Sequence, residues 1–363
     1  MKIVNVMLHK VVIGMTIAED IYNNSRLLIP KDTVVNNEVL EILRYSTIIS
    51  VPVYGKEDTG TAMSKPAIPS SQSPHSEQVR NSESFQKFEQ TFHQVTDDFS
   101  YQLNDIANRN CGVDIDALFT SAREIMAGET NTYQLMDFLS NIQYFDDATY
   151  AHSLNVALIA NILGRWLHFS EDDLKLLTVA GTLHDVGKIL IPVDIIQKPS
   201  RLTKQEFDII KQHSYKGYKL LREQNIDERI AQVALLHHEK CDGSGYPLGL
   251  KGNKINDLAK MITIVDIYEA MTANRCYREG ICPFEVIKMY EDEGYQKYDP
   301  KYLIPFLQGI SDTYLHDTVL LNDGRQGEII MTNKTALSRP FIMIGDEFVD
   351  LSRRPDLNIV SIL

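Results

Sequence analysis

The residues of this sequence best suited to chemistry are histidines and aspartates on apolar, helix-like stretches. His184 follows Leu177 and Ala180, and Asp266 follows Ile262, so each polar side chain shares a helix face with apolar neighbours. This spacing turns the polar groups toward a protein interior, where an unpaired carboxylate costs several kcal/mol. The residues of this kind are His152, His184, Asp185, His213, His237, His238 and Asp266.

The size of this set indicates metal binding. A single inward histidine is usually a hydrogen-bonded core residue, and an inward aspartate often belongs to a cap or an ion pair. Only metal ions would readily satisfy so many imidazoles and carboxylates in one interior. Nitrogen and oxygen ligands without thiolate suit Fe or Mn best, with Zn, Co or Ni as alternatives. The set is too large for one ion, so we predict two divalent ions bridged by Asp185.

A pair of metal ions supports the hydrolysis of phosphate esters. Two neighbouring ions deprotonate a bridging water near neutral pH and stabilise the charge that grows on a non-bridging phosphate oxygen. Such a site needs no nucleotide-specific loop. The sequence contains neither a P-loop nor a G-x-G-x-x-G turn after a strand.

Two motifs around these residues resemble a known family. Leu183–Lys188 reads LHDVGK and resembles the core signature of the HD superfamily of metal-dependent phosphohydrolases. His237–Gly252 reads HHEKCDGSGYPLGLKG and resembles the extended signature of the HD-GYP subgroup. The similarity covers about residues 145–310, in matching order and spacing. It implies an all-helical domain, a di- or trinuclear metal centre on the residues named above, and cyclic di-GMP phosphodiesterase activity.

The resemblance also implies roles for residues outside the metal set. Lys188, Arg275 and Arg278 occupy positions that contact substrate phosphates in the family. A guanidinium fork and an ammonium point charge both suit phosphate oxygens, and a solvated surface cation is the alternative for all three. Gly243 and Tyr246 would help to shape a rigid substrate-binding loop beside the site, in which Tyr246 either stacks on a base or simply packs.

Some positions depart from the family pattern. Ala148 stands four residues before His152, where some members have a glutamate that supports a third metal, so we predict a dinuclear centre. Lys240-Cys241 replaces the usual Arg-Trp, and Cys276 replaces the usual Pro. These changes affect loop packing near the substrate, and therefore specificity, more than they affect hydrolysis.

The motifs favour a metal-dependent phosphodiesterase that converts cyclic di-GMP to linear pGpG and, in a second turnover, to GMP. Asp185 and Lys188 are its expected catalytic residues. Three alternatives stay open. The chain could be a cyclic-dinucleotide receptor with little turnover, or it could carry out the same hydrolysis on another cyclic nucleotide or dinucleotide. It could also be a scaffold that docks a diguanylate cyclase (GGDEF) partner through the GYP loop, the segment around Gly245-Tyr246-Pro247. A homodimer also remains open.

Composition excludes some other classes of function. The chain has 363 residues, a net charge of -13 and a hydrophobic fraction of 44%, as expected for two or three folding units. The negative charge argues against nucleic-acid binding. The sequence shows no apolar run long enough to span a membrane and no signal-peptide pattern at its start, and its four cysteines form no CxxC pair. We expect a cytoplasmic protein without membrane association.

The N-terminal part is expected to be a small α/β accessory module, residues 1–55. It combines a helix at Asn36–Tyr45 with strands at Lys2–Met7, Arg26–Ile29 and Ile48–Tyr54. Residues 56–84 are rich in Ser and Pro and poor in apolar residues, so we predict a flexible linker there.

The remainder is expected to be mainly α, with a β-rich end. Residues 85–313 are predicted to form the helical catalytic domain, and capping-box patterns at Ser170 and Thr203 mark two of its helix starts. Residues 314–363 return to short strands, with a turn at Asp323–Gly324.

Overall fold

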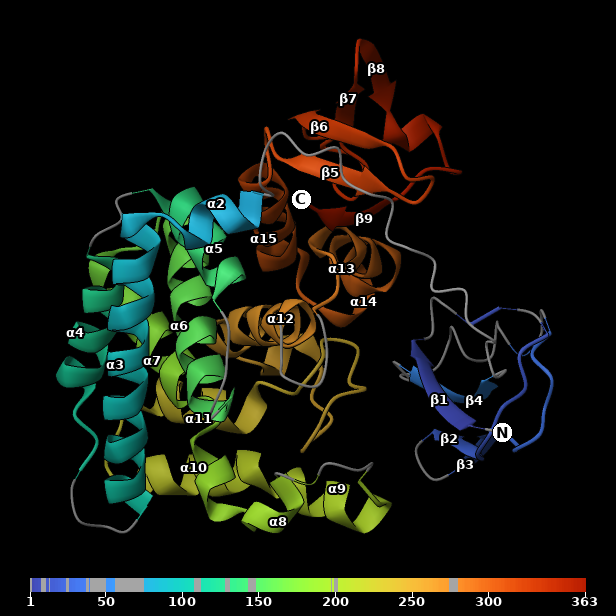
Figure 1. The fold of residues 1–363 in the computed structure, drawn as a ribbon. Coiled ribbons are helices and arrows are strands. Elements are labelled where there is room, and N and C mark those ends of the chain that lie inside the picture. The colour runs from blue at the N-terminus through green and yellow to red at the C-terminus, as the bar shows by residue number, and fades with distance from the viewer. Residues whose placement is uncertain are drawn as a thin grey trace. The chain divides into compact units, whose positions relative to one another are not determined.

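The computed structural model describes most of the chain. The described residues are 2–7, 11–12, 14–23, 26–36, 39, 50–55, 75–107, 112–127, 131–142, 148–196, 198, 202–273 and 280–363. The chain divides into two compact units, residues 1–69 and residues 70–363. Figure 1 shows the elements of both units.

The first unit contains two antiparallel strand pairs. Strand β1 (Lys2–Met7) pairs with β4 (Ser50–Gly55), and β2 (Ile21–Asn23) pairs with β3 (Arg26–Ile29). The three predicted strands are confirmed, whereas the three-residue β2 is too short to show an alternating pattern in the sequence. The predicted helix at 36–45 lies mostly outside the described residues. The apolar core of this unit includes Ile17, Ile21, Ile29, Val35, Val51 and Val53.

The second unit is mainly helical, as predicted. Its α-helices are α2 (His75–Arg80), α3 (Glu83–Ala107), α4 (Ile115–Met126), α5 (Thr132–Asn141), α6 (Ala148–Trp166), α7 (Glu171–Leu183), α8 (Val193–Ile196), α9 (Lys204–Ile210), α10 (Gln212–Glu223), α11 (Glu228–Leu236), α12 (Asp257–Thr272), α13 (Pro283–Met289), α14 (Tyr295–Lys297) and α15 (Pro300–Thr313). A short 3-10 helix at Val186–Leu190 follows α7. Among the described residues, no helix is long and apolar enough to cross a membrane.

Helices α6 and α12 form the centre of this unit. Every residue of α6 from 151 to 164 is buried, and α12 is buried on most of its surface. A helix that is apolar all round must be enclosed by other helices, and α6 packs against α3, α7, α12 and α15 (Figure 1). Polar residues placed on α6 and α12 therefore face protein on every side.

Two helix starts predicted from capping patterns are confirmed. The Thr203 side chain accepts a hydrogen bond from the Glu206 backbone, and the Glu206 carboxylate accepts one from the Thr203 backbone, which completes a capping box. Ser170 caps α7 by accepting from the backbone of Asp173. These caps fix the starts of α9 and α7.

The predicted linker, residues 56–84, is wrong over its last ten residues, which are largely helical. Helix α2 begins at His75 and α3 at Glu83, both before residue 84. Val79 is buried in the same apolar core as Phe85, whose ring meets that of Phe138 edge-on at 5.4 Å. Helix α2 could not be predicted from composition, because Val79 is a single buried apolar residue in a stretch that is otherwise rich in Ser. Residues 56–74 lie outside the described residues.

The predicted β-rich tail is confirmed as a five-stranded antiparallel sheet in the order β8-β7-β6-β5-β9. Its strands are β5 (Thr318–Leu321), β6 (Gln326–Met331), β7 (Phe341–Ile344), β8 (Glu347–Asp350) and β9 (Ile359–Ile362). Gly324 adopts a φ of +89° in the predicted turn, a conformation that glycine adopts without strain. The Glu291 carboxylate accepts hydrogen bonds from the backbone of Leu337 and from Ser338, which ties the tail to the helices.

Candidate metal centre

The structure brings all of the predicted ligand residues together. They come from five helices or helix ends: His152 from α6, His184 and Asp185 after α7, His213 from α10, His237 and His238 after α11, and Asp266 from α12. They form two groups in which the ligand atoms lie within 4.8 Å of one another. We call them the Asp266 group (His152, His184 and Asp266) and the His238 group (Asp185, His213, His237 and His238).

Asp185 lies between the two groups. Its Oδ2 atom is 3.3 Å from Nε2 of His184 and 3.7 Å from Nε2 of His152. Its Oδ1 atom is 3.3 Å from Nε2 of His213 and 3.6 Å from Nε2 of His237. One carboxylate thus offers an oxygen to each group, as a residue that bridges two cations must do.

Asp266 also reaches both groups. Its Oδ1 atom is 3.0 Å from Nε2 of His152 and 3.9 Å from Nε2 of His184, and its Oδ2 atom is 4.0 Å from Nδ1 of His238. The two aspartates therefore lie among all of the imidazoles of the set.

A close helix contact positions the first of these aspartates. A Cβ atom on Gly187 would lie 2.0 Å from the carbonyl oxygen of His213, so only glycine lets the 3-10 helix after Asp185 approach α10 this closely. The glycine of the LHDVGK motif thereby brings Asp185 to the histidine that α10 carries.

Backbone carbonyls orient three of the histidines. Nδ1 of His184 donates to the carbonyl of Gly181 at 2.7 Å. His213 and His237 donate in the same way to carbonyls three and four residues earlier, at 2.7 and 3.0 Å. A proton held on Nδ1 leaves the lone pair of Nε2 directed at the aspartates, which is the tautomer that binds a metal.

His152 has a different outer partner. Its Nδ1 atom contacts the carboxylate of Glu269, which is buried, and the Asn155 amide donates to the same carboxylate at 3.4 Å. Our sequence analysis missed Glu269. The signal was available, because Glu269 follows Asp266 by one helical turn and so shares its inward face.

Burial and neighbouring charges set the protonation of the imidazoles. Burial lowers the pKa of His213 to about 4 and holds that of His238 well below its ordinary value. Burial opposes protonation of His152 as well, but Glu269 and Asp266 outweigh it and raise the pKa of this ring to about 10. His213 and His238 are therefore neutral near pH 7, as ligands must be.

The aspartates are ionised. Burial would raise the pKa of Asp185, but Lys188 and His184 hold it well below its ordinary value. Burial likewise opposes ionisation of Asp266, and a hydrogen bond from His152 reverses this and lowers the pKa. Two buried carboxylates in one site attract cations, and in the metal-free protein Lys188 and the protonated His152 supply that charge.

Two atoms of the cluster show that these residues fit a metal. Nε2 of His184 and Oδ1 of Asp185 are buried and make no hydrogen bond within the described part of the chain. A buried polar atom without a partner costs about 1–3 kcal/mol. A divalent cation bound by nitrogen and oxygen ligands would satisfy both atoms.

The GYP loop beside the cluster is held by a buried acid. The Glu239 carboxylate accepts hydrogen bonds from the backbone N–H groups of residues 248, 249 and 250, at 2.6, 3.0 and 2.9 Å. Gly243 adopts a φ of +85°, which L side chains rarely adopt. These contacts hold the loop that carries Tyr246.

The ring of Tyr246 stacks on that of His238, with centroids 4.6 Å apart and planes 29° apart. One face of Tyr246 thus packs on a candidate ligand. Its edge meets Phe207, at a centroid distance of 6.4 Å, and the Phe207 ring is exposed. The stacking of Tyr246 on His238 restrains the His238 ring.

Of the three predicted phosphate-binding cations, Lys188 is among the described residues. The ammonium of Lys188 contacts the Asp185 carboxylate, and its side chain is 27% exposed, so it reaches from the candidate ligands toward solvent. Arg275 and Arg278 lie outside the described residues.

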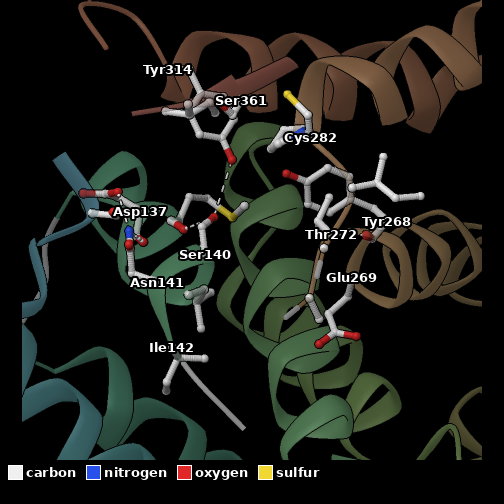
Figure 2. A pocket seen from close by; sticks show the side chains of 18 of the residues that line it. Asp137, Ser140, Asn141, Ile142, Tyr268, Glu269, Thr272, Cys282, Tyr314 and Ser361 are labelled. Carbon is white, nitrogen blue, oxygen red and sulfur yellow. Dashed lines mark hydrogen bonds between the residues drawn. The ribbon is translucent and has the colours of Figure 1, made fainter. Parts of the chain in front are cut away.

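A cavity of about 350 Å³ lies elsewhere in the helical unit (Figure 2). Its lining includes Asp137 and Ser140 of α5, Tyr268 and Glu269 of α12, and Tyr314. None of the candidate ligands lines it. Glu269 lines this cavity and contacts Nδ1 of His152, whereas the aspartates contact Nε2 of the same ring.

Comparisons with known proteins agree with this geometry. Residues 137–302 match the family model described as HD domain. A cyclic di-GMP phosphodiesterase of Pseudomonas aeruginosa is 32% identical over 57% of this chain and 50% of its own length. The cyclic di-GMP phosphodiesterase response regulator RpfG of Xanthomonas campestris is 33% identical over 53% of this chain and 51% of its own length. Residues 137–302 of the chain are therefore similar to the HD domain family, which confirms the resemblance in its motifs.

The similarity to these relatives covers only part of each chain. The chain spans about half the length of these curated relatives. A 3'3'-cGAMP-specific phosphodiesterase of Vibrio cholerae is 32% identical over 42% of this chain and 33% of its own length. A solved structure of the HDG"Y"P protein Bd1817 from Bdellovibrio bacteriovorus aligns with 86% of this chain and 99% of that one, at a TM-score of 0.47 and 18% identity.

Proposed function

We propose that this chain is a metal-dependent phosphodiesterase that hydrolyses cyclic di-GMP. The observation that carries the proposal is the convergence of buried imidazoles and carboxylates around Asp185, with two buried ligand atoms left without a partner. The names of the relatives from Pseudomonas and Xanthomonas support the substrate.

The two groups of residues would each hold one divalent ion, Fe or Mn best, with Asp185 shared between them. When bound, such ions supply Lewis acidity and lower the pKa of water to near neutral. His213 and His238 are neutral near pH 7 and would bind a cation without losing a proton, whereas a cation would displace the proton of His152.

The cations at the rim would bind the substrate. The Lys188 ammonium contacts Asp185 and is partly exposed, so it would pair with a phosphate oxygen close to the reacting phosphorus. Arg275 and Arg278 would hold the phosphates as well. Hydrolysis of one phosphodiester bond yields linear pGpG, and of both yields GMP. The expected cytoplasmic location, a homodimer and a GGDEF partner at the GYP loop also belong to this proposal.

The experiment compares His184→Ala with His93→Ala, a matched exchange of an exposed histidine on α3. Protein purified without oxygen is analysed for metal and incubated with cyclic di-GMP, and pGpG is followed by chromatography. We expect H184A to lose metal and turnover together and H93A to keep both. Full metal content and full turnover in H184A would overturn the proposal, whereas bound metal and bound ligand without turnover in the wild type would favour a receptor.

A second candidate substrate is 3',3'-cyclic GMP-AMP. Relatives from Vibrio cholerae that are 32–34% identical carry names specific for this dinucleotide. The same metal centre would serve either substrate, because it acts on the phosphodiester and not on the base. Competition between the two dinucleotides, measured as the ratio of kcat/KM, decides between them.

A further inference from the structure

We propose that the two groups bind metal ions with unequal affinity and that Glu269 sets the difference as a positioning residue behind His152. The Asp266 group would fill first and the His238 group second. This inference rests on the proposed metal-dependent function and deepens it, because it assigns an order of loading to the same site.

The ring of His152 lies between two carboxylates. Its Nε2 atom is 3.0 Å from Oδ1 of Asp266, and its Nδ1 atom contacts Glu269. Glu269 is 2% exposed, so water does not screen its charge. A carboxylate that accepts the outer N–H of a histidine fixes the ring and strengthens the opposite nitrogen as a metal ligand.

The other histidines with a defined outer partner lack such a charge. Nδ1 of His213 and of His237 donates to a backbone carbonyl, and so does Nδ1 of His184 within the Asp266 group. A carbonyl dipole orients the ring but brings no full charge. Among the described contacts of the ligand rings, the contact with Glu269 is the one in which a carboxylate outside the candidate ligand set holds a histidine.

The charges of the two groups differ accordingly. The Asp266 group contains Asp266, has Glu269 behind it and shares Asp185. The His238 group contains Asp185, and Oδ2 of Asp266 lies 4.0 Å from Nδ1 of its His238, but among the described contacts no further carboxylate stands behind its rings. A divalent cation that displaces the proton of His152 is left with Glu269 as one more buried carboxylate than the His238 group offers, so it gains more Coulomb energy in the Asp266 group, which we infer to be the tighter site.

Helix α12 supplies both acids of the tighter site. Asp266 and Glu269 are three residues apart, so one helix face presents a direct ligand and the support for a second ligand. The Asn155 amide, three residues after His152 on α6, donates to the other oxygen of the Glu269 carboxylate at 3.4 Å and so helps to restrain it. Figure 2 shows the Glu269 side chain at the border of the cavity described above.

The test is a calorimetric titration of the metal-free full chain with Mn²⁺. We expect two binding steps in the wild type. Glu269→Gln keeps the shape and a hydrogen-bond acceptor but removes the charge, and it should weaken the tight step by about 10- to 100-fold while leaving the weak step unchanged. Glu269→Asp should restore part of the affinity. Glu291→Gln, the same exchange at a carboxylate that binds the tail, serves as the matched control and should change neither step.

A complementary variant tests the order without touching Glu269. His213→Ala removes a ligand of the His238 group and should abolish the weak step while leaving the tight one. Thermal unfolding of each metal-free variant shows whether it is folded before the titration is compared.

The outcomes separate the two proposals. Two steps of equal affinity in the wild type, an E269Q titration equal to that of the wild type, or an equal loss in both steps would overturn this inference and leave the proposed function standing. A wild-type protein that binds no metal would overturn the proposed function as well.

Discussion

Two buried acids of the helical unit, Asp185 and Glu239, are satisfied in opposite ways. Glu239 accepts hydrogen bonds from three backbone N–H groups of the GYP loop. Asp185 lies among imidazoles, and its Oδ1 atom makes no hydrogen bond to any described residue. Both side chains are almost fully buried, so burial does not distinguish them.

The difference between the partners of Glu239 and Asp185 indicates that the two buried acids have different roles. A carboxylate that the backbone satisfies stabilises the native chain by itself. A carboxylate that the protein leaves short of partners, in a cluster of like residues, depends on a bound cation for its stability. We therefore expect Glu239 to stabilise the fold and Asp185 to bind a cation.

Removal of metal gives the largest expected effect on this comparison. A chelator should lower the Tm of wild-type protein, because an ion at about 100 times its Kd adds about 2.7 kcal/mol of stability. Asp185→Ala should lose this response together with hydrolysis of cyclic di-GMP. Differential scanning calorimetry with and without chelator measures the shift. A D185A protein that still responds to chelator like the wild type would contradict the role of Asp185.

Glu239→Gln should show the opposite pattern. The amide accepts the loop N–H groups less well and brings donors of its own, so the free energy of unfolding should fall by about 1–3 kcal/mol. Metal content should stay as in the wild type, because Glu239 is not among the candidate ligands. Urea denaturation and metal analysis of the same preparation test both parts. Loss of metal with unchanged stability would reverse the assignment of the two acids.

A smaller effect is expected at the contact between the loop and the ligands. Tyr246→Ala removes the ring that stacks on His238 and should weaken metal binding by up to about 10-fold, as stacking is worth about 0.5–1.5 kcal/mol. Tyr246→Phe keeps the ring and should bind metal like the wild type. Mn²⁺ titration of both variants measures the effect. Equal affinity in Y246A and Y246F would show that the stacked ring does not support the site.

The last prediction is a pH dependence of the metal-free protein. The pKa of His213 falls from 6.5 to about 4 on folding, so below pH 6.5 the unfolded chain binds a proton that the folded chain does not. This residue therefore makes stability fall as pH decreases from about 6.5 to about 4. His213→Gln should reduce the slope in denaturation curves recorded across this range. An unchanged slope would contradict the neutral, buried state of the ring.

Much of the site was predictable because its residues carry a periodic signal. His184 and Asp266 follow apolar residues at helical spacing, and this spacing is enough to direct them inward. The motifs around Asp185 and His237 then named a family whose ligands coincide with these positions. The tail sheet was predictable for a different reason, because its strands are short runs rich in apolar residues that are separated by turn signals.

The other features of the site could not be predicted, because they depend on contacts that form only in the folded chain and leave no local pattern in the sequence. Glu239 accepts from backbone groups of a loop that begins several residues later, and only the folded loop shows this. The stacking of Tyr246 on His238 depends in the same way on the path of the loop. Glu269 had a periodic signal, but its partner on α6 lies more than a hundred residues away in the sequence.

The central claim is that these imidazoles and carboxylates hold a pair of cations on either side of Asp185. The most direct measurement is anomalous X-ray diffraction from crystals of the full chain loaded with Mn²⁺. The account predicts two anomalous peaks, one beside each carboxylate oxygen of Asp185. A single peak remote from Asp185, or no peak among these side chains at saturating metal, would contradict it.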